Sequence, residues 1–170
     1  MLVKGHCGIG KSNRTAEEIR ELYRSDRSSV STLIISGRRS LAHGQKTLFD
    51  GFKSYLDLDI RKLNPKDTPQ LIISPESIHK LGTTGYDVII LDEFETITQN
   101  FSGPTMKKPK LSHDVYKSLL QSASLILALD ATLDSDSAVH LQNLSKIDAD
   151  NSTVIWNQHM RYSQSSYTYK

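Results

Sequence analysis

The chain has 170 residues, of which 37% are hydrophobic and 24% are charged, so it is long enough to fold as one ordinary globular domain. This composition excludes disordered, collagen-like and disulfide-rich proteins, and the single cysteine, Cys7, cannot form an internal disulfide. The longest strictly apolar run, from Leu125 to Leu129, is far shorter than the roughly 18 residues of a membrane span. We therefore expect neither a membrane span nor a secretion signal.

The positive charge is concentrated near the N-terminus. The net charge is only +2, but residues 1–40 carry eight Lys or Arg residues against four Asp or Glu residues. Such an excess suits a phosphate-rich ligand. A solvated basic helix face explains the same excess equally well.

Short apolar runs alternate with amphipathic segments along the chain. We expect strands at residues 1–4, 31–36, 59–63, 70–74, 86–91, 125–129 and 153–156. We expect helices at 11–24, at 38–55 with interruptions near Gly44 and Gly51, in a short stretch from Pro75, at 111–121 and at 135–144, and an exposed basic loop at 101–110. Strands separated by helices predict an α/β fold, with a mostly parallel central sheet and helices on both faces.

The segment between the first strand and the first helix matches the phosphate-binding pattern G-x-x-x-x-G-K-[ST] in full. Its glycines let consecutive backbone amides surround phosphate oxygens, and the helix that follows directs its positive end at the same anion. Lys11 would reach the β- and γ-phosphates, and the Ser12 hydroxyl would bind Mg²⁺. The predicted nucleotide-binding residues are Gly5, His6, Cys7, Gly8, Ile9, Gly10, Lys11 and Ser12.

Two adjacent acids, Asp92 and Glu93, end the most apolar predicted strand. Ligand sites of open α/β sheets lie at the carboxyl ends of the strands. There, Asp92 would hold Mg²⁺ and Glu93 would orient and deprotonate an attacking water, so Glu93 and Lys11 are the predicted catalytic residues. Such a pair favours hydrolysis over transfer to a small molecule. Glu95 is expected to be a surface acid or to support the site.

Three further segments follow predicted strands. Ser36, Gly37, Arg38 and Arg39 combine a small turn, a helix start and two guanidinium groups, which is a suitable grip for a nucleic-acid backbone. Ser74 begins a similar turn without arginines. Each segment could equally be only a helix cap.

Asp130 and Thr132 follow a strand that we expect between the strand before the glycine-rich loop and the strand that ends in the acidic pair. From that place they could sense the loss of the γ-phosphate. Helix capping is again the alternative.

The order of these segments resembles motifs I, Ia, Ib, II and III of superfamily-two helicases. Two segments make the likeness more specific, Arg-Arg-Ser at 38–40 and Asp-Ala-Thr-Leu at 130–133. They resemble the corresponding motifs of the herpesvirus-type replication-origin-binding helicases. Some other viruses and phages carry related proteins. The likeness spans about residues 1–160.

The resemblance implies a RecA-like P-loop NTPase, a three-layer sandwich, in which residues 1–160 form the ATP-binding motor domain and 161–170 a linker or the start of a second domain. It implies ATP and Mg²⁺ as cofactors, DNA rather than RNA as the nucleic-acid partner, a second RecA-like domain in cis or in trans, and an intracellular site of action in the cytoplasm or nucleus of a host cell. Carried over to this chain, Ser36, Arg38, Arg39 and Ser74 would contact the nucleic-acid strand, and Thr132 would couple the two sites.

The chain departs from these helicases in its extent. It leaves no room for a second RecA-like domain with its arginine finger, and no adenine-binding segment precedes Gly5, so we expect an excised first motor domain. Such a domain would bind ATP weakly and hydrolyse it slowly, because a missing arginine finger removes about 10³–10⁵ in rate. A non-motor P-loop ATPase that acts as a nucleotide-dependent switch or assembly factor is the alternative. A degenerate P-loop fold that only binds DNA is a third hypothesis.

Overall fold

The computed structural model describes residues 1–5, 11–25, 30–37, 49, 51–58, 67–81, 85–104 and 106–157. Within them, seven strands form one sheet in the order β3-β4-β2-β5-β6-β1-β7. The strands are β1 Leu2–Gly5, β2 Thr32–Ser36, β3 Lys53–Ser54, β4 Gln70–Ile73, β5 Val88–Asp92, β6 Leu125–Asp130 and β7 Val154–Asn157. Every pairing between these strands is parallel, which confirms the α/β prediction.

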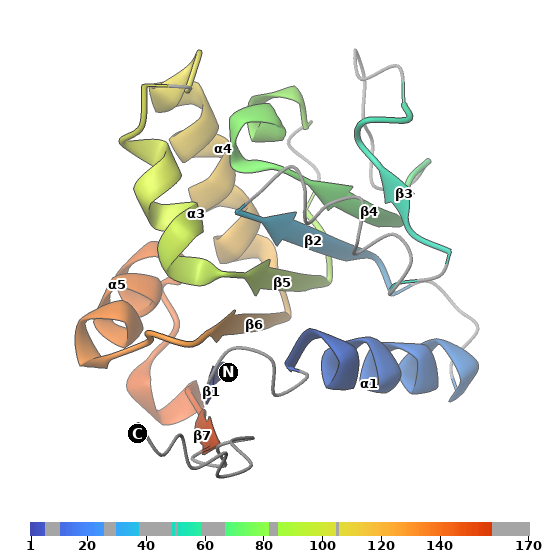
Figure 1. Ribbon diagram of the computed structural model, residues 1–170, viewed down its shortest axis with the longest axis vertical. Helices are drawn as coiled ribbons and strands as arrows, with labels where there is room; N and C mark the ends of the chain where they lie inside the picture. Colours follow the sequence, from blue (N-terminus) through green and yellow to red (C-terminus); the bar gives the residue numbers. More distant parts are fainter. Residues whose placement is uncertain are drawn as a thin grey trace, which may run out of the picture.

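Helices cover both faces of the sheet (Figure 1). The helical elements are α1 Lys11–Ser25, η2 Pro75–Lys80, α3 Phe94–Phe101, α4 Pro109–Ser122, α5 Ser135–Ser145 and η3 Ala149–Asn151. In Figure 1, α3, α4 and α5 lie on one side of the strands and α1 on the other, giving three layers. No described helix is both long enough and apolar enough to cross a membrane.

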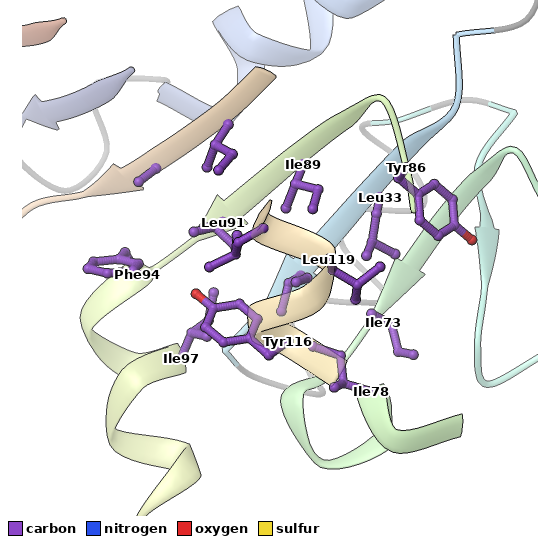
Figure 2. Close-up of a cluster of buried hydrophobic side chains, with 14 of the residues drawn as sticks. Leu33, Ile73, Ile78, Tyr86, Ile89, Leu91, Phe94, Ile97, Tyr116 and Leu119 are labelled. Atoms are coloured by element: carbon purple, nitrogen blue, oxygen red, sulfur yellow. The ribbon is translucent and has the colours of Figure 1, made fainter. Parts of the chain in front are cut away.

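Alternation along the strands builds the two halves of the core. Ile35, Ile73 and Leu91 belong to the larger cluster, which residues of α3, α4 and α5 complete. Figure 2 shows Ile73 and Leu91 with Phe94 and Ile97 of α3 and Tyr116 and Leu119 of α4. Ile34 and Ile90, one position away, pack on the opposite face with residues that include Ala16 of α1. Because neighbouring strand residues face opposite sides, a strand buried on both faces is apolar throughout. This explains the continuous apolar runs in the sequence.

The predicted helix over 38–55 is wrong at its C-terminal end. Lys53–Ser54 is an edge strand, and the Tyr55 amide donates to the Ile72 carbonyl across 2.9 Å. Phe52 and Tyr55 are spaced as on one helix face, yet they belong to core clusters on opposite sides of the sheet. Gly51, at φ 89°, lies in the turn that leads into this strand.

The segment 101–110 is less of a loop than expected, because Phe101 ends α3 and Pro109 begins α4. Lys107, Lys108 and Lys110 are exposed, as the prediction of a basic surface requires. The strand predicted at 59–63 lies outside the described residues, as does most of the predicted helix over 38–55.

Candidate nucleotide site at the carboxyl edge of the sheet

The parallel strands bring the predicted site residues to one edge of the sheet. Gly5, Ser36, Asp92 and Asp130 are each the last residue of a strand, and Ser74 directly follows one. Strand β6 lies between β1 and β5, which confirms the predicted order. The five positions therefore share the edge where open α/β sheets bind ligands.

The phosphate-loop match has the backbone context that such a motif needs. Gly5 ends β1, and α1 begins at Lys11. The intervening His6, Cys7, Gly8, Ile9 and Gly10 lie outside the described residues, and so does the Lys11 side chain. Arg14, one turn into α1, forms an exposed ion pair of 2.7 Å with Glu18, so this part of the N-terminal basic charge is a solvated helix face.

Ser12 and Asp92 are brought together across the sheet. The Ser12 hydroxyl donates a hydrogen bond to Asp92 Oδ1, with 3.1 Å between the oxygens. Asp92 is 8% exposed, and its strand is paired with β2 on one side and β6 on the other, which fixes its position. Two elements that are distant in the sequence thus present a hydroxyl and a carboxylate to one point.

This donor set fits Mg²⁺. Mg²⁺ usually binds one or two carboxylates and completes its shell with water and substrate phosphates, rather than with an all-protein cage. No group of three or more His, Cys, Asp or Glu side chains in the described part of the chain is placed to hold a metal. One hydroxyl and one carboxylate at a single point fit the small share of an Mg²⁺ shell that protein side chains usually supply.

Glu93 adopts an unusual backbone conformation. Its φ and ψ are 61° and 64°, in the left-handed region, where a side chain costs on the order of 1 kcal/mol. The Glu93 amide donates to the Leu129 carbonyl at 2.9 Å, and its own carbonyl accepts from the Ile97 amide at 3.0 Å. Neighbouring strand and helix thus hold the strained turn directly after Asp92. Strain of this kind concentrates at functional sites.

Asp130 ties β6 to the start of α3. Its Oδ2 accepts from the Glu95 amide at 2.9 Å, and its Oδ1 accepts from the Thr132 amide and hydroxyl, each at 2.9 Å. Burial disfavours the charge of Asp130, but the hydrogen bonds from Thr132, Glu95 and Ala131 outweigh it and lower the pKa of the carboxyl. Thr132 therefore fixes the orientation of the Asp130 carboxylate.

Glu95 links two helices. Its carboxylate accepts a hydrogen bond from the Ser137 hydroxyl, in the first turn of α5. The Ser137 amide in turn donates to Asp134, which caps α5. Nothing in the sequence marked this link, because it joins residues from two separate helices.

The predicted nucleic-acid residues are described only in part. Ser36 and Gly37 are buried at the end of β2, while Arg38 and Arg39 lie outside the described residues. Ser74 is 1% exposed, and its hydroxyl has no hydrogen-bond partner among the described residues. Asn100 of α3, which the sequence did not single out, donates through Nδ2 to the Gly37 carbonyl at 2.8 Å.

Comparison with known proteins identifies the family. The family model described as origin of replication binding protein matches residues 1–165. The chain is 33% identical over 137 residues to the replication origin-binding protein of human herpesvirus 6A, covering 78% of this chain and 16% of that protein. It is 30% identical over 142 residues to that of varicella-zoster virus strain Dumas, covering 79% of this chain and 16% of that protein. The chain thus spans about a sixth of the length of these relatives.

Solved structures share the fold at low sequence identity. Saccharomyces cerevisiae Dbp5, in a complex that includes ADP, matches with a TM-score of 0.61 at 14% identity, covering 92% of this chain and 43% of that one. The SWI2/SNF2 ATPase core of Sulfolobus solfataricus, in complex with double-stranded DNA, matches with a TM-score of 0.57 at 14% identity, covering 83% and 30%. The fold is therefore the RecA-like domain of helicases, and the chain belongs to the origin of replication binding protein family.

Proposed function

We propose that the chain is an ATP-binding and ATP-hydrolysing motor domain of a DNA helicase or translocase that acts in DNA replication. The observation that carries the proposal is the contact between the Ser12 hydroxyl and Asp92 Oδ1. It joins the residue after the phosphate-loop lysine to the acid at the end of the central strand. The family and the fold support the same assignment.

In this proposal, different residues of the chain bind the phosphates, hold the metal ion, accept the proton and contact DNA. Backbone amides of residues 5–12 and the Lys11 ammonium bind the phosphates of ATP, and Ser12 and Asp92 hold Mg²⁺. When bound, Mg²⁺ neutralises charge on the phosphate oxygens. Glu93 accepts a proton from the attacking water. Arg38 and Arg39 contact the DNA strand, while the buried Ser36, Gly37 and Ser74 shape the turns at the same edge of the sheet. A second RecA-like domain, in cis or in trans, supplies the arginine finger.

The direct test is binding of ATP with Mg²⁺ to the 170-residue chain, measured by isothermal titration calorimetry. Lys11→Ala should abolish detectable binding, and Ser12→Ala should weaken binding in Mg²⁺ much more than in EDTA. Lys117→Ala and Ser118→Ala, two exposed positions on α4, serve as matched controls. Equal affinity of wild type and Lys11→Ala would overturn the proposal.

The alternatives make different predictions. A nucleotide-dependent switch hydrolyses ATP at a rate that single-stranded DNA does not change, whereas a motor domain is stimulated. A degenerate fold that only binds DNA shows no rise in melting temperature with ATP and Mg²⁺, whereas a bound ligand stabilises the native state. The described contact between Ser12 and Asp92 favours a working nucleotide site over this last alternative.

A further inference from the structure

Gly37 is held by the segment that begins with the acidic pair. The Gly37 amide donates to the Asp92 carbonyl at 3.3 Å, and the Gly37 carbonyl accepts from Asn100 Nδ2 at 2.8 Å. Both backbone polar groups of this buried glycine are therefore bonded to β5 and α3. The second bond fixes the carbonyl of the peptide unit that leads into Arg38.

The space around Gly37 is equally restricted. A Cβ built there would lie 2.8 Å from Thr96 Cγ2 and 3.5 Å from the Glu93 carbonyl oxygen. Real Cβ atoms essentially never come as close as 2.8 Å, so any side chain would push α3 away from β2. A glycine is thus required at this position because α3 approaches the end of β2 too closely for a Cβ atom. We call Gly37, Thr96 and Asn100 the glycine clamp.

Helix α3 connects the clamp rigidly to Glu93. Thr96 and Asn100 are four residues apart, so they lie on one face of the helix, toward Gly37. The strained Glu93 directly precedes the helix, and its carbonyl accepts a hydrogen bond from the Ile97 amide. Ile97 and Phe94 anchor it in the core. A change in the Glu93 turn would therefore shift Thr96 and Asn100, the two clamp residues on α3, relative to Gly37.

We propose that Asn100 is a positioning residue that couples nucleotide occupancy at Asp92 and Glu93 to the DNA contact at Arg38 and Arg39. The inference rests on the proposed function. It deepens that function by naming the hydrogen bond through which α3 holds Gly37, the residue before Arg38. A hydrogen bond can couple the two sites only by the difference between its free energies in the nucleotide-bound and nucleotide-free states. Loss of one neutral hydrogen bond should therefore reduce the coupling between nucleotide and DNA binding about three- to tenfold.

The experiment measures the affinity of the 170-residue chain for a fluorescent single-stranded oligodeoxynucleotide, with and without AMP-PNP and Mg²⁺. The ratio of the two dissociation constants is the coupling factor. Asn100→Ala removes the donor, and Asn100→Asp keeps the shape but places a carboxylate oxygen against the Gly37 carbonyl. Gln99→Ala, at the exposed neighbouring position, is the control.

Both Asn100 variants should move the coupling factor toward one, while AMP-PNP affinity and nucleotide-free DNA affinity stay within about twofold of wild type. The control should match wild type. The Asn100→Asp protein lacks the donor, so wild-type coupling in that protein overturns the inference. A coupling factor of one in wild type, with both ligands bound, also overturns it but leaves the nucleotide site intact. If the chain did not bind AMP-PNP at all, that result would instead contradict the proposed function.

A second measurement needs no variant. Amide hydrogen exchange of the wild-type segment from Gly37 to Ser40 should change on addition of AMP-PNP and Mg²⁺, because the clamp moves with the Glu93 turn. The amides of α4 serve as the internal reference. Unchanged exchange from Gly37 to Ser40 at saturating nucleotide would overturn the inference even if the Asn100 variants failed to fold.

Discussion

The Ser12 hydroxyl and Asp92 Oδ1 lie 3.1 Å apart although 80 residues separate them in the sequence. Ser12 comes from the first turn of α1 and Asp92 from the end of β5, two strands away from β1. The sheet order alone makes this meeting possible. It also places Glu93, the next residue, beside the same site.

Glu93→Gln is expected to bind ATP with wild-type affinity and to hydrolyse it about 10²–10⁴-fold more slowly, since the amide cannot accept the proton of the attacking water. Single-turnover hydrolysis and a binding titration would separate the two effects. Glu95→Gln is the matched control, because Glu95 bonds to Ser137 of α5 and has no predicted chemical role. Normal turnover in Glu93→Gln would assign the base to another group.

Replacing Arg38 and Arg39 by alanine should flatten the salt dependence of single-stranded DNA binding. Each lost phosphate contact lowers the slope of log affinity against log salt by about 0.7. The double variant should therefore lose up to about 1.4 units, measured by fluorescence anisotropy over a salt series. Arg14→Ala is the control, because Arg14 is paired with acids of its own helix. An identical change in both proteins would contradict the assignment.

Asp130→Asn should destabilise the fold by about 1–3 kcal/mol at neutral pH, because an amide cannot accept from both Glu95 and Thr132 as the carboxylate does. The pKa of Asp130 lies below the ordinary 3.8. Its charge therefore stabilises the protein fully above the unfolded-state pKa, and this contribution is lost as pH falls through the lower folded-state pKa.

Urea unfolding at neutral and acidic pH would show both effects of Asp130→Asn. The free energy of unfolding should be lower than in wild type at neutral pH, and it should fall less steeply below about pH 4. Asp114→Asn, exposed on α4, provides the comparison. Equal stability of Asp130→Asn and wild type across this range would show that the hydrogen bonds to Asp130 contribute nothing net.

Two buried tyrosines should respond oppositely to loss of the hydroxyl. Tyr116 has no hydrogen-bond partner for its hydroxyl among the described residues, and burial raises its pKa. Tyr116→Phe should therefore stabilise the protein by about 1 kcal/mol. The Tyr86 hydroxyl donates to the Thr68 carbonyl at 3.1 Å, and burial raises its pKa to about 12. Tyr86→Phe should cost about 1 kcal/mol, and thermal unfolding would rank the pair.

Much of the fold is predictable from apolar runs. Val88 to Leu91 and Leu125 to Leu129 are continuous because both faces of their strands are covered, and polar residues follow where the strands end. The same regularity places Asp92 and Asp130 at one edge. The edge strand Lys53–Ser54 was not predicted, because two residues are too few to show a strand period. In addition, Phe49 and Phe52 imitate the spacing of a helix.

The remaining features depend on contacts between elements. Asn100 is a polar residue within a short helix, and its role becomes visible only where α3 passes Gly37. The left-handed turn at Glu93 has no sequence marker either, because no glycine stands there. Such positions are set by how the strands and helices pack, which local composition does not encode.

The place of β6 in the sheet has one more consequence. Neighbouring strands lie about 4.8 Å apart, so the ends of β1 and β5 are separated by about 10 Å, a span that β6 alone maintains. Buried Ala128 lies in this spacer strand, in register with Leu2 and Leu91. A bulky replacement there would press on the helices that cover this face of the sheet and displace the strand ends. On the proposed function, it should therefore weaken the binding of ATP with Mg²⁺.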